Sequence, residues 1–111
     1  MTYEQFKIES YPDHQFRVSK ISPVDLMAIT QTIDFEKYEA NKTLINFCLE
    51  NAEVLMGEKW IPVKTKGREV YQPIGIENNL MALNEIYLWM MENVIAKTFM
   101  KSSGSTEKTQ Q

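Results

Sequence analysis

Apolar and polar residues alternate with a period of two in two short stretches near the start of the chain. Both stretches lie within residues 4–20 and flank a run with turn-forming residues at 10–14. The apolar positions are Phe6 and Ile8 in the first stretch, then Phe16 and Val18 in the second. Because successive side chains of a strand point to opposite faces, this alternation is typical of strands with one buried face. We therefore predict a β-hairpin over residues 4–20.

A second hairpin is predicted at residues 53–63. Two largely apolar runs flank Gly57-Glu58. Glycine suits the first position of a two-residue hairpin turn, because that position needs a positive φ. Pro62 has no N–H to donate to a neighbouring strand, so its strand is expected at a sheet edge. The basic stretch 64–68 is then a loop, and residues 69–71 form one more short strand.

A helix start signal separates the two hairpins. Ser22 supplies a hydroxyl that can cap free N–H groups, Pro23 suits the first helical position, and Asp25 complements the positive end of the helix. The helix is expected to end near residue 31 or 32. The residues expected to face the core are Val24, Met27 and Ala28.

A second helix is expected to follow, capped by Asp34 and running to about Asn51. Residues three or four positions apart lie on the same side of a helix. The residues expected on the buried side are Tyr38, Asn41, Ile45, Cys48 and Ala52, widened by Leu44, Phe47 and Leu49.

The longest apolar segment, residues 76–100, predicts a helix that begins near Glu77 and is apolar on two sides. A core-facing stripe is formed by Ile76, Leu80, Leu83, Tyr87, Met90 and Val94. A second flank is formed by Leu88, Met91, Ile95 and Phe99, with Ile86 and Trp89 between the two series, and Asn78, Glu85 and Glu92 mark a narrow solvated strip. A helix that is apolar around most of its circumference must be covered on more than one side. The predicted protein-interaction residues are therefore Leu88, Trp89, Met91, Ile95 and Phe99.

These elements predict one small α+β domain, mostly α-helical, over residues 1–101. It has about three helices, the last of them long, and one or two short β-hairpins. The 111 residues include 43% hydrophobic and 24% charged residues, which is enough for a single core. Residues 102–111 contain no large apolar side chain and are expected to form a disordered polar tail.

Charge and targeting signals exclude several classes of partner. The formal net charge of −3 gives the chain no overall attraction to phosphate backbones, so nucleic acid is not an expected partner. An alternative is a small nucleic-acid platform in which Lys64, Lys66 and Arg68 lie beside Trp60 and Tyr71. We expect no secretion signal, because the first residues contain neither a basic region nor an apolar run. We expect no membrane span, because polar residues interrupt the apolar run of segment 76–100.

Catalytic and metal-binding chemistry finds little support in the sequence. His14, the one histidine, lies in a predicted turn, and Cys48, the one cysteine, lies on the buried side of a predicted helix. Together they match no metal-ligand spacing, and the isolated glycines form no phosphate-binding loop. The chain is therefore not expected to be an enzyme or to hold a cofactor or metal.

Six segments, taken in order and at their spacing, resemble the tail assembly chaperones of long-tailed bacteriophages that infect Gram-positive hosts. They span most of the chain between residues 16 and 100. The segments are 16–26 (FRVSKISPVDL), 33–35 (IDF), 47–51 (FCLEN), 56–60 (MGEKW), 67–71 (GREVY) and 75–85 (GIENNLMALNE).

This resemblance implies a small, largely helical protein that acts in the host cytoplasm and is absent from the mature virion. Its implied client is the tape measure protein, a very long helical chain that would otherwise aggregate before tail tube proteins polymerise around it. A homo-oligomer is also expected, because self-association would cover the second apolar flank of the long helix. The alternative from a different class is a structural virion component, such as a tail completion or head–tail joining protein.

Overall fold

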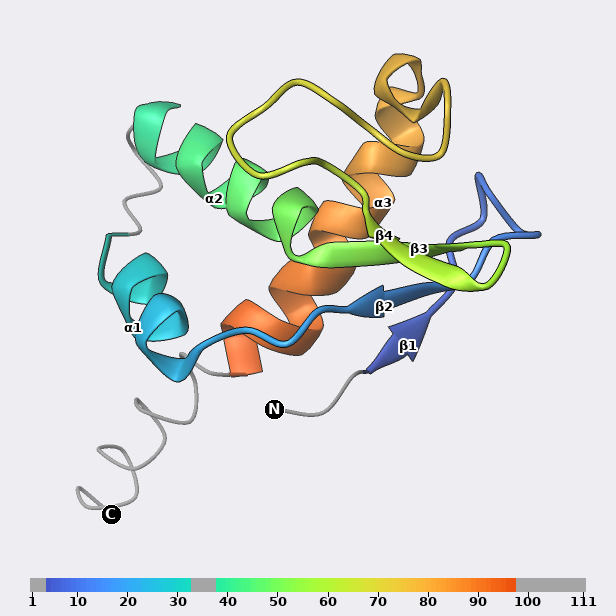
Figure 1. Cartoon of the computed structure of the whole chain (residues 1–111). Coiled ribbons are helices and arrows are strands. Elements are labelled where there is room, and N and C mark those ends of the chain that lie inside the picture. Colours follow the sequence, from blue (N-terminus) through green and yellow to red (C-terminus); the bar gives the residue numbers. More distant parts are fainter. Residues whose placement is uncertain (1–3, 33–37, 98–111) are drawn as a thin grey trace.

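The computed structural model describes residues 4–32 and 38–97 of the chain. In these residues three α-helices pack with a four-stranded antiparallel sheet (Figure 1). In chain order the elements are β1 (Gln5–Phe6), β2 (Phe16–Val18), α1 (Pro23–Thr32), α2 (Tyr38–Glu50), β3 (Ala52–Met56), β4 (Lys59–Pro62), a 3₁₀ turn (Ile76–Asn78), α3 (Leu80–Met90) and a π-helical turn (Met91–Ile95). The α+β class expected from the sequence is confirmed.

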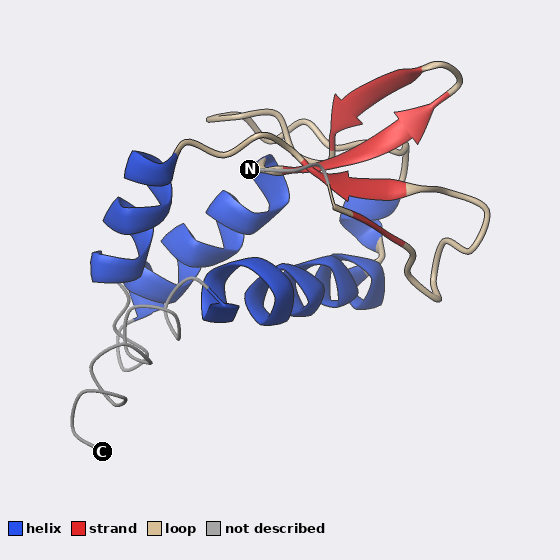
Figure 2. Cartoon of the chain, turned by 90° about the horizontal axis from the view of Figure 1, so that it is seen from below, coloured by secondary structure: helices blue, strands red, loops and turns tan. Residues whose placement is uncertain are grey.

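The two predicted hairpins join into one sheet with the strand order β1-β2-β3-β4. β2 and β3 pair antiparallel, with Phe16 opposite Val54. Both side chains are buried on the face that packs against α3, and α3 runs along that side of the sheet (Figure 2). On the opposite face, the Arg17 Nε donates to Glu53 Oε1 at 2.7 Å, and the guanidinium lies 4.3 Å from the centre of the Trp60 ring.

Turn and edge chemistry follow the sequence prediction at the second hairpin. Gly57 has φ 67°, the positive value that the turn requires. β4 is an edge strand, and the Val63 N–H donates to the Ala52 carbonyl at 2.8 Å. In an antiparallel ladder, hydrogen-bonded residue pairs alternate with pairs that share no hydrogen bond. Val63 and Ala52 are hydrogen-bonded, so the neighbouring pair, Pro62 and Glu53, is not. The Pro62 nitrogen therefore faces away from the sheet. Residues 69–71 form no strand, only a bridge between Lys64 and Tyr71.

The start of α1 is as predicted, but its buried side is not. The Ser22 hydroxyl accepts a hydrogen bond from the Val24 N–H at 3.2 Å, and Pro23 is the first helical residue. Leu26 and Ile29 face the core. The residues predicted to do so are exposed: Val24 (71%), Met27 (57%) and Ala28. α1 is apolar on both sides, so periodicity alone does not determine which side packs on α2.

α2 buries Leu44, Cys48 and Leu49, as expected, but leaves Ile45 exposed. Ile45 lies on the side of α2 that faces α3, where it lines an open groove. At its end, the Phe47 carbonyl accepts two hydrogen bonds from Asn51, one from the backbone N–H at 3.1 Å and one from the side-chain amide at 2.9 Å. The predicted cap Asp34 lies outside the described residues.

α3 begins at Leu80, later than predicted, because Asn79 caps it: the Asn79 Oδ1 accepts from the Ala82 N–H at 3.1 Å. Of the predicted core stripe, Ile76, Met90 and Val94 are buried, Leu83 and Tyr87 are partly buried, and Leu80 is exposed. Glu85, predicted to be solvated, instead accepts hydrogen bonds from the backbone N–H groups of residues 9 and 10, each at 3.2 Å. It thereby holds the β1–β2 turn against α3.

The π-helical turn corrects the predicted orientation of Ile95. Ala96 donates its N–H to the Met91 carbonyl, five residues back, instead of four residues back as in an α-helix. The extra residue in this turn brings Ile95 round to the buried side, where it is 1% exposed. Ile95 is therefore a core residue, and its prediction as an interaction residue is wrong.

Three other expectations concern the end of the chain and the membrane. Phe99 and the predicted tail at 102–111 lie outside the described residues. Within residues 4–32 and 38–97, no helix has both the length and the apolar character needed to cross a bilayer.

Candidate protein-interaction surface

Large apolar side chains are exposed along one helix. On α3, Leu80, Met81 and Leu88 are 80%, 70% and 53% exposed, and Met91 in the following turn is partly exposed. We call these four residues the α3 strip. Single exposed apolar residues are normal on soluble proteins, whereas several gathered on one element form a candidate surface for contact with a partner.

A groove of about 260 Å³ lies beside the α3 strip, between α2 and α3. Spacings of three and four residues direct one line of side chains from each helix into it. Its apolar lining consists of Ile45 and Leu49 from α2, Leu80, Leu83 and Tyr87 from α3, and Tyr71 from the preceding loop. The side-chain amides of Asn46 and Asn84 add hydrogen-bonding groups. We call this the α2–α3 groove.

A second hollow, of about 340 Å³, continues the same surface toward the end of the described chain. Leu88, Met91, Glu92 and Ala96 line it. Methionine is flexible and polarizable, so a methionine at this position can adapt to partner side chains of different shape. Glu92 supplies one negative charge at the rim.

The α2–α3 groove carries no side chain that changes charge near neutral pH. Burial raises the pKa of the Tyr71 phenol to about 12, and a 2.7 Å hydrogen bond from its hydroxyl to Glu69 acts in the same direction. Burial likewise raises the pKa of Tyr87. Both phenols stay neutral, and the two amides do not titrate. Binding in this groove should therefore not depend on pH in the neutral range.

The five predicted interaction residues occupy different environments: some lie on the surface, some are buried, and one lies outside the described residues. Leu88 and Met91 lie on the surface and line the second hollow. Trp89 is partly buried, and its ring stacks on Phe6 with ring centres 4.0 Å apart and an interplanar angle of 10°, so it holds β1 against the helix. Ile95 is in the core, and Phe99 is outside the described residues.

Sequence reasoning missed the α2–α3 groove because it assigned the groove residues to the core. Ile45, Leu80, Leu83 and Tyr87 all belong to stripes predicted to be buried. A possible signal was the number of such residues, which exceeds what one side of a short helix pair can bury.

The two residues weighed for catalysis in the sequence, Cys48 and His14, both lie in packed positions. Cys48 is fully buried, and this burial raises the pKa of its thiol to about 12, so it carries no thiolate at neutral pH. His14 packs edge-on against Tyr11, with ring centres 5.5 Å apart. No group of three or more histidine, cysteine, aspartate or glutamate side chains in residues 4–32 and 38–97 is placed to hold a metal ion.

The alternative nucleic-acid platform loses one of its three cations. Lys64 is 3% exposed, and its ammonium group lies 3.2 Å from the Glu50 carboxylate. The same Glu50 oxygen accepts the Gly67 N–H at 3.1 Å. Lys64 therefore anchors the loop internally, and only Lys66 and Arg68 remain exposed.

Fold and surface together define a small α+β domain with an exposed apolar groove and helix strip. Comparison with known proteins adds no assignment: the chain matches no protein-family model, no curated protein and no solved structure.

Proposed function

We propose that the protein is a phage tail assembly chaperone that binds the tape measure protein. The α2–α3 groove and the α3 strip hold an apolar stretch of this client, and the bound chaperone helps to recruit tail tube subunits during tail assembly. The observation that carries the proposal is the exposure of Leu80, Met81 and Leu88 along one helix. The resemblance of the six sequence segments supports the choice of client.

The size of this surface is appropriate for reversible binding. Complete burial of an exposed leucine or methionine contributes roughly 1.5–3 kcal/mol. The three exposed residues of α3 could therefore contribute several kcal/mol, which association entropy of about 4 kcal/mol or more largely offsets. Weak binding of the client to this surface is useful to a chaperone, because the client must be released when tube subunits arrive.

Self-association is part of the proposal. In the absence of client, a second copy can cover the same apolar surface, so we expect a homo-oligomer whose subunits compete with the client. In this proposal the protein binds its client in the host cytoplasm, and the finished virion does not contain the protein.

Co-expression with the tape measure protein of the same phage tests the proposal. The chaperone should increase the soluble fraction of the client, and Leu88→Asp should abolish most of that increase. Val70→Asp is a matched control, because Val70 is 49% exposed and Leu88 is 53% exposed, but Val70 lies in the loop after β4. Equal effects of the two substitutions would contradict the proposed surface.

Mass spectrometry of purified phage particles distinguishes a chaperone from a structural virion component. We expect no peptides of this protein in mature tails. Its presence in stoichiometric amounts would refute the chaperone proposal in favour of a tail completion or head–tail joining role.

A further inference from the structure

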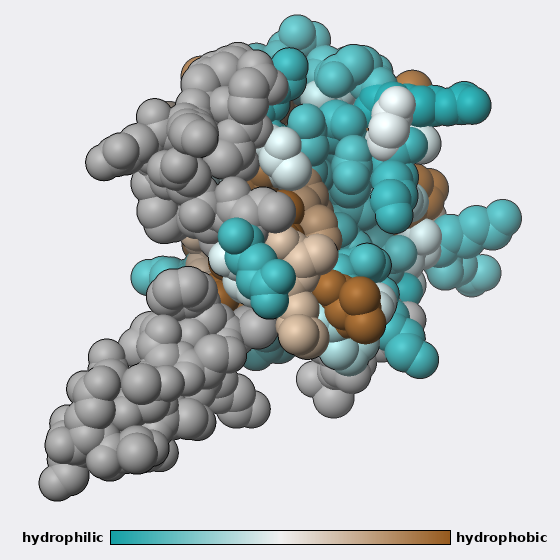
Figure 3. Space-filling model, turned by 90° about the vertical axis from the view of Figure 1, so that its left-hand side faces the viewer, coloured by the Kyte–Doolittle hydropathy of each residue, from teal (hydrophilic) through white to brown (hydrophobic). Residues whose placement is uncertain are grey.

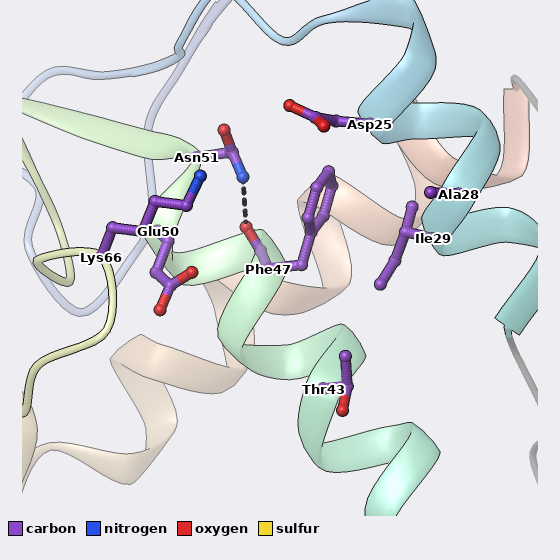
Figure 4. A pocket seen from close by; sticks show the side chains of 8 residues that line it. All are labelled: Asp25, Ala28, Ile29, Thr43, Phe47, Glu50, Asn51 and Lys66. Carbon is purple, nitrogen blue, oxygen red and sulfur yellow. Dashed lines mark hydrogen bonds between the residues drawn. The ribbon is translucent and has the colours of Figure 1, made fainter.

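A separate pocket lies on the other side of α2, where α1 and the loop after β4 approach it (Figure 4). Its volume is about 330 Å³. Ile29 of α1 and Phe47 of α2 form an apolar base, and Asp25 and Lys66 supply opposite charges at the rim. Helical spacing explains why it is separate from the α2–α3 groove: residues 43, 47 and 50 line this side of α2, whereas residues 45 and 49 line the other.

The two carboxylates of the pocket differ in whether a neighbouring residue pairs with them. One oxygen of the Glu50 carboxylate accepts from both Lys64 and Gly67, so Glu50 is already neutralised by a neighbour. Asp25 has no hydrogen bond or ion pair with any other residue described in the structure. It is held in place by the first turn of α1, whereas Lys66 is an exposed side chain with a long flexible stem.

Phe47 gives the pocket a preference for a cation. The face of an aromatic ring carries partial negative charge, which attracts cations and disfavours anions. In Figure 4 the Phe47 ring and the Asp25 carboxylate are directed toward the same space from two helices. A planar cation could therefore lie on the ring and pair with the carboxylate.

The protein already contains a complete arrangement of this kind. On the outer face of the sheet, the Arg17 guanidinium lies over Trp60 at 4.3 Å and donates to Glu53 at 2.7 Å. The pocket between α1 and α2 has the aromatic ring and the carboxylate but lacks the guanidinium. Arginine fits this combination better than lysine, because its planar group stacks on rings and donates two parallel hydrogen bonds.

We propose that this pocket binds an arginine side chain of a partner protein, stacked on Phe47 and paired with Asp25. A protein segment is a better occupant than a free guanidinium compound, because apolar side chains extend the contact beyond the pocket. Val24 and Met27 flank the pocket residues of α1 and are exposed, and apolar surface is visible on the face of the molecule that carries α1 (Figure 3). This proposal does not depend on the α2–α3 groove or on its client.

An NMR titration of the full chain with blocked arginine amide tests the charge requirement. We expect saturable shifts in the backbone amides of the pocket, with a dissociation constant in the millimolar range. Blocked citrulline amide, which has the same shape without the charge, should not bind. Comparable binding of the citrulline and arginine probes would refute the guanidinium assignment, as would the absence of shifts at tens of millimolar.

Substitutions then identify the groups involved. Asp25→Asn removes the negative charge that pairs with the guanidinium, so it should weaken arginine binding by about tenfold, which corresponds to about 1.4 kcal/mol. Asp13→Asn, which changes an exposed aspartate in the β1–β2 turn, should leave binding unchanged. Lys66→Ala should strengthen it, because a like charge is removed from the rim. If Lys66→Ala abolishes binding, or if blocked glutamate amide binds in place of arginine, the pocket selects anions and the proposal is wrong.

A blocked Leu-Arg-Leu peptide tests the protein source. It should bind several-fold more tightly than the single blocked arginine, and Val24→Ser should remove that gain without affecting the single residue. Equal affinities of peptide and single arginine would overturn the assignment to a protein segment.

Discussion

Ile95 and Leu88 provide the sharpest test of the described arrangement of α3. Both are large aliphatic residues on one helical segment, and both are predicted from the sequence to contact a partner. The structure assigns them opposite roles, because Ile95 is 1% exposed and Leu88 is 53% exposed. We therefore compare Ile95→Ala with Leu88→Ala in otherwise identical protein.

The magnitudes follow from burial. Replacing a buried isoleucine by alanine costs roughly 2–5 kcal/mol, since it removes transfer free energy and leaves a cavity. About half of the Leu88 side chain stays exposed in the folded protein. Full burial of a leucine contributes roughly 1.5–3 kcal/mol, so Leu88→Ala removes at most about half of that stabilisation. We expect Ile95→Ala to lower the free energy of unfolding by about 3 kcal/mol and Leu88→Ala by about 1 kcal/mol or less.

Urea unfolding, followed by tryptophan fluorescence and far-UV circular dichroism, measures both values. With a slope of about 1–3 kcal/mol/M, Ile95→Ala should shift the midpoint by roughly 1–3 M. The measurements are repeated at two protein concentrations, because self-association adds to the apparent stability. Equal destabilisation of the dilute protein by both substitutions would mean that Leu88 is also a core residue, and the surface assignment would be refuted.

Three further predictions concern buried groups. Glu50→Gln leaves the buried Lys64 ammonium without its anion and should cost roughly 3–5 kcal/mol in urea unfolding; no loss of stability would contradict the burial of Lys64. Cys48 should react with a thiol reagent at pH 8 only as fast as the protein opens. Its pKa rises from the ordinary 9.0 to about 12 on folding, so the unfolded chain loses this proton first: stability is full below pH 9 and falls by about 1.4 kcal/mol per unit as pH rises toward 12. Phe6→Ala should cost roughly 3–5 kcal/mol and alter the Trp89 emission, because it removes the stacked ring; an unchanged spectrum would argue against this stack.

Local chemistry explains what could be predicted from the sequence. The two hairpins follow from alternation and from the needs of single residues, such as the positive φ at Gly57 and the missing donor at Pro62. The Ser22 cap is equally local. The pairing of β2 with β3 brings together segments separated by two helices, and no local pattern specifies that register.

The errors occur where more than one packing satisfies the same pattern. α1 is apolar on both sides, and its contact with α2 decides that Leu26 and Ile29 face inward. Ile95 was assigned to the wrong side because a 3.6-residue repeat does not anticipate a π-helical turn. Of the surface itself, Leu88 and Met91 could be predicted. The α2–α3 groove could not, because it depends on the spacing between two helices.

The outward-facing nitrogen of Pro62 has a consequence for how copies of the protein can meet. An exposed sheet edge is a template on which another chain can add a strand and begin a cross-β fibril. Along β4 the missing N–H interrupts the row of donors that such growth requires. Aggregation by strand addition is therefore disfavoured at this edge, and the self-association that we propose would use the helical surface instead.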